Sequence, residues 1–523
     1  MKNIALAAVL LLMTTICFCQ SQTNALLTIE ADTLNLKGNS DKWTTHVNST
    51  GAQTNALISF ADKDRVYYFL VDPSLQLIGK YSVDKDAMPA NYYGPNYNIV
   101  LQISDNTSFK NYVHGKKDNK IIVEHVDLNQ GTSSTADFLQ FGKKEKFLTA
   151  FEDNHHLYFI TLPAKSHKLH VYVDSLEVAK EIELKIEDSL MHINLEKNLN
   201  DIMIIKNSKE PDLYSCKSLT KLYVQGNGEV VLTIDSNFQF TALFKIDLNN
   251  FTSKSKFIRK SFFYCNDNEY ASDLKSNSFV YKDKILQGVF CRNDMLMQLK
   301  DISTDSIVTE LHASRDSSSI DFASSNLIKR EESKKKTIGI VALIESDFRF
   351  ESNVRKEKEK ELKTGSFFRA VNNSYFTFLI VQQGEFMILK IGEAHDAVQS
   401  NGVSVSAGPI GGVHPVGGGF TPFGKASAAG LPSNQFTYFY TAGPTYRREV
   451  VGEIETYFKT IFKSGFSEFV PSTDIETKYD KVDHAIDKLK DVIVSEAAFE
   501  FNQRTCLFYL DKKKKKFVIE QIE

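Results

Sequence analysis

Residues 65–83, "RVYYFLVDPSLQLIGKYSV", contain the pattern that decides the fold. An apolar run rich in aromatic and β-branched residues ends at Asp72, and a second run of the same kind follows after a short turn. Runs of this length and composition favour strands over helices. The Asp72 carboxylate can accept a hydrogen bond from the backbone two residues further on, which closes a turn. The stretch therefore predicts an antiparallel β-hairpin.

Similar units recur along the chain, starting roughly 40 to 60 residues apart, which is the spacing of four-stranded propeller blades. A four-residue motif ends an apolar strand that we expect to be an inner one. The motif is an apolar residue, Asp, any residue, and then Ser or Asn. It occurs at 71–74, 126–129 and 246–249, with a looser copy at 300–303. The recurrence predicts a mainly β, β-propeller-like repeat of about seven or eight blades. Tandem β-sandwich domains are the alternative. Other expected strands include 120–127, 157–163, 201–207, 240–247, 287–294, 336–345, 375–381, 436–443 and 505–511.

The two ends of the chain supply strand-like segments that could close such a ring. Residues 25–36 and 516–523 both read as strands, and their pairing in one blade would leave no open sheet edge. Two segments differ from the β pattern. Residues 474–494 are predicted to form one amphipathic helix, because Thr473 and Glu476 resemble a capping box and an apolar stripe follows. The mixed-charge run 354–363 is predicted to be a solvated turn or hairpin tip.

The N-terminus predicts export. Lys2, an apolar run and a short polar stretch form the pattern of a signal peptide over residues 1–19, followed by a single propeller-like domain over 20–523. A lipid anchor on Cys17 or Cys19 is the weaker alternative. We expect the protein in the periplasm, at the outer-membrane surface or secreted, with no transmembrane segment in the mature chain. A net charge of −3 argues neither for nucleic acid nor for an anionic membrane, and we expect no nucleic-acid partner.

Residues 402–434 form a Gly/Pro-rich segment that is predicted to be a long loop. Within it, "GGGFTPFGKAS" (417–427) nearly matches a P-loop. No strand precedes the motif and no helix can follow it, so we expect neither nucleotide nor any other cofactor. Loops of this length are functional or disordered. Apolar residues and a near absence of charge favour an ordered interaction loop, with these residues as its candidate contacts: Ile410, His414, Phe420, Phe423 and Lys425.

Other potential sites are weak. His155, His156, His167 and His170 are close in sequence, but the hairpin expected for 157–162 and 169–174 separates the two pairs, so no metal site is predicted. The segment 265–273 lacks the spacing of a calcium loop. The lysines at 512–516 fit a solvated hairpin tip. No G-x-S-x-G motif occurs, and the catalytic residues of any enzyme activity remain unknown.

The mature cysteines leave two interpretations open. Cys216, Cys265, Cys291 and Cys506 could form up to two disulfides in an oxidising compartment, or remain as small buried thiols.

The signal peptide ending in "CFCQ", the Asn- and Lys-rich composition and the blade-like spacing resemble those of uncharacterised secreted β-propeller-like proteins of Bacteroidota. The resemblance implies no catalytic residue. The sequence favours a non-enzymatic binding or scaffold protein whose partner is another envelope or extracellular protein. An extracellular hydrolase, either a glycosidase or a peptidase, with carboxylates at the mouth of the central channel is the alternative.

Overall fold

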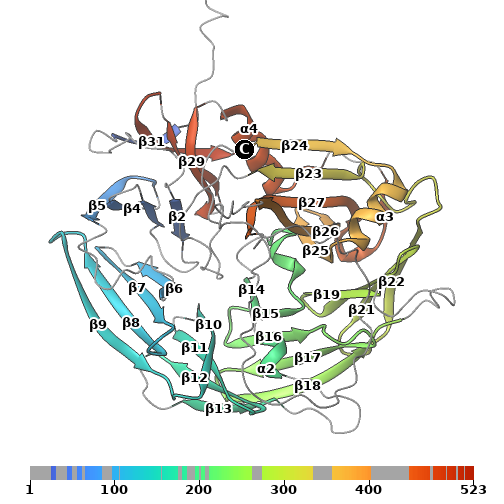
Figure 1. Ribbon diagram of the computed structural model, residues 1–523, viewed down its shortest axis with the longest axis horizontal. Coiled ribbons are helices and arrows are strands. Elements are labelled where there is room, and N and C mark those ends of the chain that lie inside the picture. Colours follow the sequence, from blue (N-terminus) through green and yellow to red (C-terminus); the bar gives the residue numbers. More distant parts are fainter. Residues whose placement is uncertain are drawn as a thin grey trace, which may run out of the picture.

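In the computed structural model the described residues are mainly in β-strands (Figure 1). The predicted signal peptide and the expected strands at 336–345 and 436–443 lie outside the residues that the structure describes. No helix in the described ranges is long and apolar enough to cross a membrane. These ranges are 25–30, 44–49, 56–61, 65–72, 74–84, 97–104, 107–154, 156–174, 179–184, 195–199, 202–206, 211–261, 274–333, 356–401, 447–471, 475–489, 492–501, 504–511 and 513–522.

The described strands form seven sheets, which we number as blades in chain order. Blade 1 contains β2 (Thr44–Ser49), β3 (Ala56–Ala61), β4 (Arg65–Val71) and β5 (Leu77–Asp84). Blade 2 contains β6 (Tyr97–Ser104), β7 (Ser108–Gly115), β8 (Lys120–Asp127) and β9 (Thr132–Gln140). Blade 3 contains β10 (Glu145–Asp153), β11 (His156–Pro163), β12 (Lys168–Val173) and β13 (Lys180–Glu183).

Blade 4 has an additional strand that runs parallel to its neighbour. It contains β14 (Ile202–Lys206), β15 (Thr220–Val224), β16 (Glu229–Ile234), β17 (Phe240–Asp247) and β18 (Thr252–Arg259). Blade 5 contains β19 (Lys275–Tyr281), β20 (Lys284–Phe290), β21 (Asp294–Asp301) and β22 (Ile307–Ser314). Blade 6 contains β23 (Ile328–Ser333), β24 (Lys356–Glu361), β25 (Tyr375–Gln383), β26 (Phe386–Asn401), β27 (Arg447–Lys463) and β28 (Phe469–Val470).

The ring closes in blade 7, which combines both ends of the described chain. The strands β29 (Ile493–Phe501), β30 (Arg504–Asp511) and β31 (Lys516–Ile522) come from the C-terminal part, and β1 (Ala25–Glu30) pairs antiparallel with β31. Figure 1 shows the blades following one another around a circle. The predicted propeller and its closing strand pair are therefore confirmed, with seven blades among the described strands. A row of independent sandwiches would not share one sheet between its two ends.

The hydrophobic core is divided among the spaces between neighbouring blades. Side chains alternate between the two faces of a strand, so each blade contributes residues to two cores. Phe69 packs with Phe508 and Phe517 between blades 1 and 7. Tyr68, the adjacent residue, packs on Phe109 of blade 2. This face-to-face packing makes each sheet depend on both of its neighbours.

The repeated aspartates close hairpins, as the sequence predicts. The Oδ1 of Asp127 accepts hydrogen bonds from the backbone N–H groups of Asn129 and Gln130 at 2.9 and 3.0 Å. The same kind of turn contact recurs at Asp72, Asp247, Asp301 and Asp511. The motif ends an inner strand of its sheet, because β4, β8, β17 and β21 each lie between two other strands, and it leads into the strand at the sheet edge.

The predicted amphipathic helix exists as α4 (Lys478–Leu489), which is shorter than 474–494. Thr473 lies outside the described residues, and the capping box is instead formed by Thr477 and Asp480. The Thr477 N–H donates to Asp480 Oδ2 at 2.6 Å and the Asp480 N–H donates to Thr477 Oγ1 at 3.2 Å. Val482 and Ile486 pack against blade 7, whereas Ile493 belongs to β29.

Two further differences concern blade 6 and its surroundings. The charged run at 354–363 is not a turn, because residues 356–361 form β24, which pairs with β23 at the outer edge of the sheet. A charged outermost strand discourages pairing with other molecules. Two helices not expected from the sequence also occur, α2 (Leu195–Asn198) and α3 (Thr364–Asn372).

Candidate functional site

The hairpin formed by β26 and β27 is the distinctive feature of blade 6. Its strands have 16 and 17 residues and pair from Phe386↔Lys463 to Asn401↔Arg447. The neighbouring strand β25 pairs with β26 only as far as Ala394, and β23 pairs with β27 only as far as Gly452. Beyond these points the hairpin continues as a two-stranded ribbon, which we call the stem. In Figure 1 the free end of the stem lies near the middle of the ring.

The predicted interaction loop begins where the stem ends. Residues 402–434, including Ile410, His414, Phe420, Phe423 and Lys425, lie outside the described residues, as does the near P-loop at 417–427. Asn401 and Arg447 are directly opposite each other in the ladder. The structure therefore fixes the two points from which the loop leaves the ring.

Gly392 allows the strands to approach closely at the base of the stem. A Cβ atom at this position would lie 1.9 Å from the carbonyl oxygen of Thr456 and 2.8 Å from the Cα of Tyr457. Both atoms belong to the backbone of β27, which cannot move aside in the way a side chain can. This glycine has a packing role that its position inside a strand indicates.

We expect Gly392→Ala to destabilise blade 6 by about 3 kcal/mol, because overpacking against backbone forces the two strands apart. The measurement is guanidinium unfolding, followed by far-UV circular dichroism. Gly365→Ala is the matched control. Gly365 lies in α3, and a Cβ atom at this position would meet no atom within 4 Å. An unchanged midpoint for Gly392→Ala would show that the strands can separate without cost.

Blade 4 holds the stem through Asp396. Its carboxylate accepts a hydrogen bond from the Tyr214 hydroxyl, and the Lys217 ammonium lies 3.8 Å from the same carboxylate oxygen. Lys217 also lies over the Tyr214 ring, 3.5 Å from its centroid. Burial and the adjacent Asp396 charge raise the pKa of the Tyr214 hydroxyl, which therefore stays protonated and donates. These contacts fix the stem to the neighbouring part of the ring.

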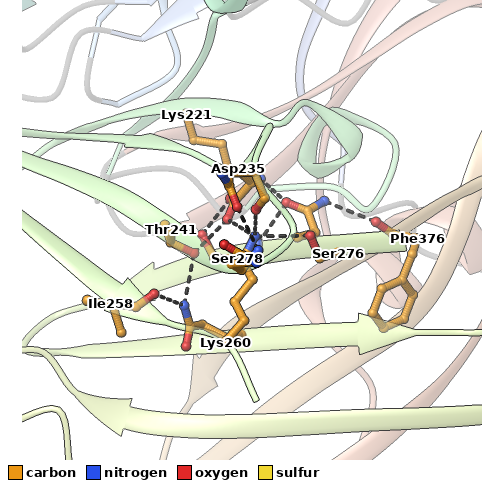
Figure 2. Close-up of polar contacts among 12 residues, drawn as sticks. Lys221, Asp235, Thr241, Ile258, Lys260, Ser276, Ser278 and Phe376 are labelled. Carbon is orange, nitrogen blue, oxygen red and sulfur yellow. Dashed lines mark hydrogen bonds and ion pairs between the residues drawn. The ribbon is translucent and has the colours of Figure 1, made fainter. Parts of the chain in front are cut away.

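A buried polar network lies beside this region, between blades 4 and 5 (Figure 2). Asp235, which directly follows β16, is 2% exposed and lies 3.1 Å from the Lys260 ammonium. Its carboxylate also accepts hydrogen bonds from Thr241 Oγ1 at 2.7 Å and Ser278 Oγ at 2.6 Å. Lys260 in turn donates to the carbonyl of Asn237 at 3.0 Å. The aspartate is thus satisfied by groups from both blades.

The second half of the network centres on Asn277 of β19. Its Oδ1 accepts a hydrogen bond from the Lys221 ammonium at 2.6 Å, and its Nδ2 donates to the carbonyls of Cys216 and Phe376 at 3.2 and 3.0 Å. Lys221 also donates to the carbonyl of Ser218 at 2.5 Å. Asn277 therefore connects blades 4, 5 and 6.

Burial and pairing oppose each other in the Asp235–Lys260 pair. Burial alone would raise the pKa of the Asp235 carboxyl, but the charges of Lys260 and Lys221 outweigh it and lower that pKa below its ordinary value. Burial lowers the pKa of Lys260, and the Asp235 charge offsets part of this shift. The 3.1 Å contact places the two groups as an ion pair enclosed by hydrogen bonds, and paired buried charges of this kind usually stabilise only as a unit.

The sequence analysis did not identify the buried lysines Lys221 and Lys260. A lone lysine in a strand reads as a solvent-facing residue. The position of Lys221 among mostly apolar residues in "TKLYV" (220–224) was the only signal in the sequence. The structure shows that all five residues are buried. Because β15 is buried on both faces and lies next to the additional parallel strand β14, a lysine on it requires a polar partner.

The histidines singled out from the sequence do not meet. The expected hairpin of 157–162 with 169–174 is present as β11 and β12. His156 contacts Asp174 at 2.9 Å and His170 contacts Glu145 at 2.9 Å, while His167 lies beside the turn and His155 is outside the described residues. Within the described ranges no three His, Cys, Asp or Glu residues are placed to bind a metal ion.

The lysines and cysteines occupy structural positions. Lys513, Lys514 and Lys515 are exposed in the turn between β30 and β31, as expected for a hairpin tip. Cys216 and Cys506 are buried free thiols, and Cys291 is buried as well. Cys265 and the rest of the segment 265–273 lie outside the described residues.

Comparison with known proteins identifies no family. No protein-family model and no curated protein matches the chain. Partial likenesses exist to solved structures of the dihydro-heme d1 dehydrogenase NirN and of an oligogalacturonate lyase in complex with manganese. The first has 9% identity and a TM-score of 0.25, covering 51% of this chain and 47% of that one. The second has 10% identity and a TM-score of 0.26, covering 51% and 67%.

A structure from a study of two prolyl endopeptidases has 8% identity and a TM-score of 0.26, covering 68% of this chain and 55% of that one. The chain thus spans about half the length of several of these proteins. Likenesses at this level carry no inference about function, and the fold assignment rests on the strand topology of the chain itself.

Proposed function

We propose that this protein is an exported, non-enzymatic binding or scaffold protein of the periplasm or cell surface, with another envelope or extracellular protein as its partner. The observation that carries the proposal is the stem, a paired ribbon that presents residues 402–446 from a fixed point on the ring. Loops on a rigid scaffold commonly bind partners. The apolar composition of the segment fits a protein contact better than a solvated linker.

The anchoring of the stem supports this function. Tyr214 and Lys217 fix Asp396, and the buried network beside them holds blades 4, 5 and 6 together. A loop that leaves a fixed stem loses less conformational entropy on binding than one leaving a mobile hairpin. The ring then acts as the support and the loop as the contact.

A hydrolase remains the alternative function, and the buried carboxyl of Glu124 is the group to consider for it. Glu124 of blade 2 is 1% exposed and accepts a hydrogen bond from Asn111 at 2.8 Å. Burial raises its pKa, and the bond from Asn111 offsets part of this shift. Asn111 is itself bonded to Gln102 at 2.6 Å, which places Glu124 in a structural amide network. Glycosidase chemistry would need a second carboxyl across an open cleft.

The test replaces residues 402–446 by Asn-Gly between Asn401 and Arg447. These two residues are paired, so a two-residue turn can close the shortened hairpin. Tagged parent and variant are crosslinked in the native envelope and their captured proteins compared. We expect one partner to be captured by the parent and lost from the variant, with both proteins showing the β-sheet signal of the folded ring in far-UV circular dichroism.

A matched control changes a different exposed turn. The triple variant Lys513→Ser, Lys514→Ser and Lys515→Ser alters the hairpin tip between β30 and β31 and should still capture the partner. Equal capture by the shortened variant would contradict the loop as the contact. Specific capture by none of the proteins would contradict the binding function and would direct attention to hydrolase substrates.

A further inference from the structure

Lys221 and Asn277 meet in the sealed space between two blades. Lys221 lies on β15 of blade 4, and Asn277 lies on β19 of blade 5. The lysine is 0% exposed and the asparagine 1% exposed, and the lysine nitrogen is 2.6 Å from the amide oxygen. An amine and a carboxamide are thus held against each other away from bulk water.

The Asn277 carboxamide is fixed and polarised. Its nitrogen donates to two backbone carbonyls, which prevents rotation of the amide plane. Its oxygen also accepts a hydrogen bond from the Ser278 backbone N–H at 2.9 Å. A donor aimed at a carbonyl oxygen stabilises the negative charge that forms there when a nucleophile adds to the carbon. Fixed neighbours of this kind produce high effective concentrations.

We propose that Lys221 and Asn277 form an intramolecular isopeptide bond that joins blade 4 to blade 5. The Lys221 ammonium first gives one proton to Asp235, and its uncharged nitrogen then adds to the Cγ of Asn277. One N–C bond forms, and the C–N bond to the side-chain nitrogen of Asn277 breaks. The departing nitrogen takes a second proton from Lys221 and the proton held by Asp235, and leaves as an ammonium ion. The reaction needs no oxidant, reductant or further reactant.

Asp235 provides the negative charge beside the reacting groups. Figure 2 shows Asp235 beside Lys221, and its carboxylate accepts a hydrogen bond from the hydroxyl of Ser278, the residue after Asn277, at 2.6 Å. Asp235 is the proton carrier of this reaction, because it takes the first proton from Lys221 and returns it to the departing nitrogen. After the bond forms, Lys260 and Asp235 remain as one buried ammonium facing one buried carboxylate, while a buried charge at Lys221, which is costly, is removed.

The test is a peptide map of the purified mature chain, unfolded before digestion with trypsin. We expect no cleavage after Lys221 and a branched peptide containing Lys221 and Asn277 whose mass is lower by one ammonia than the sum of its parts. Cleavage after Lys275 is the internal control, since this lysine is held by backbone carbonyls. Complete recovery of the two linear peptides would overturn the proposal.

Variants distinguish the isopeptide bond from other reactions that release ammonia. Lys221→Arg and Asn277→Ala should yield only linear peptides, whereas Asn277→Asp should still link, with loss of water in place of ammonia. A cyclised Gln20 or a succinimide at Asn277 also loses ammonia but joins no two peptides, so finding either without a branched peptide contradicts the proposal. Asp235→Asn should slow linking in freshly folded protein; linking at the parent's rate would overturn the role assigned to Asp235.

Discussion

Lys260→Met is expected to lower the free energy of unfolding by about 3–5 kcal/mol near neutral pH, because it leaves a buried carboxylate without its partner. The side chains of Lys260 and Asp235 are both 0% exposed and lie 3.1 Å apart. Methionine fills a volume similar to that of lysine. The lost stability therefore measures the missing charge of Lys260 more than a change in packing. Chemical unfolding of parent and variant in the same buffer measures the difference.

An exposed ion pair supplies the matched control. Lys168 and Glu181 lie 2.7 Å apart, but their side chains are 50% and 53% exposed. Lys168→Met should leave the midpoint of unfolding nearly unchanged, because water and salt screen an exposed ion pair. Equal losses in the two variants would contradict the view that the Asp235–Lys260 pair is a buried unit.

The effect should also depend on pH in a defined direction. In the parent, the pKa of Asp235 is lowered, so its stabilising contribution is present above its ordinary value of 3.8 and is lost as the pH falls through the lower folded pKa. In Lys260→Met, burial dominates and raises that pKa. The folded variant then keeps a proton that the unfolded chain releases, so the destabilisation should shrink between pH 7 and about pH 4.5. A loss that grows on acidification would contradict this assignment.

The features predicted from the sequence are those written in local patterns. Asp127 and Asp247 close their turns because an aspartate after a strand can bond the next backbone N–H groups, whatever lies around it. The closing pair of β1 and β31 was predicted because both ends of the chain read as strands and an open edge is unfavourable. Such signals depend on few neighbours in space.

The buried network could not be predicted in the same way. Lys221 and Asn277 are 56 residues apart, and nothing near either of them indicates the other. The capping box of α4 was displaced for a related reason, since Asp480 is selected by its tertiary contact with Lys459, whose ammonium bonds its carboxylate. The loop residues from Ile410 to Lys425 remain a prediction, and the structure adds the stem from which they leave the ring.

A chain that begins at residue 31 and so lacks β1 is expected to lose on the order of 5 kcal/mol of stability and to self-associate. The loss combines backbone hydrogen bonds at about 1 kcal/mol each with the burial of Ile29, which is 8% exposed, at about 1.5–3 kcal/mol. The edge of β31 would then present unpaired N–H and C=O groups to other molecules.

Guanidinium unfolding and size-exclusion chromatography over a range of concentrations measure the two effects, with a chain that begins at residue 20 as the reference. Two substitutions in β1 divide the contribution. Ile29→Ala should cost about 2–4 kcal/mol, whereas Leu26→Ser, at a position that is 39% exposed, should change stability by less than about 0.5 kcal/mol. A monomeric shortened chain with the reference midpoint would mean that six complete blades and the three strands of blade 7 hold the ring without its closing strand.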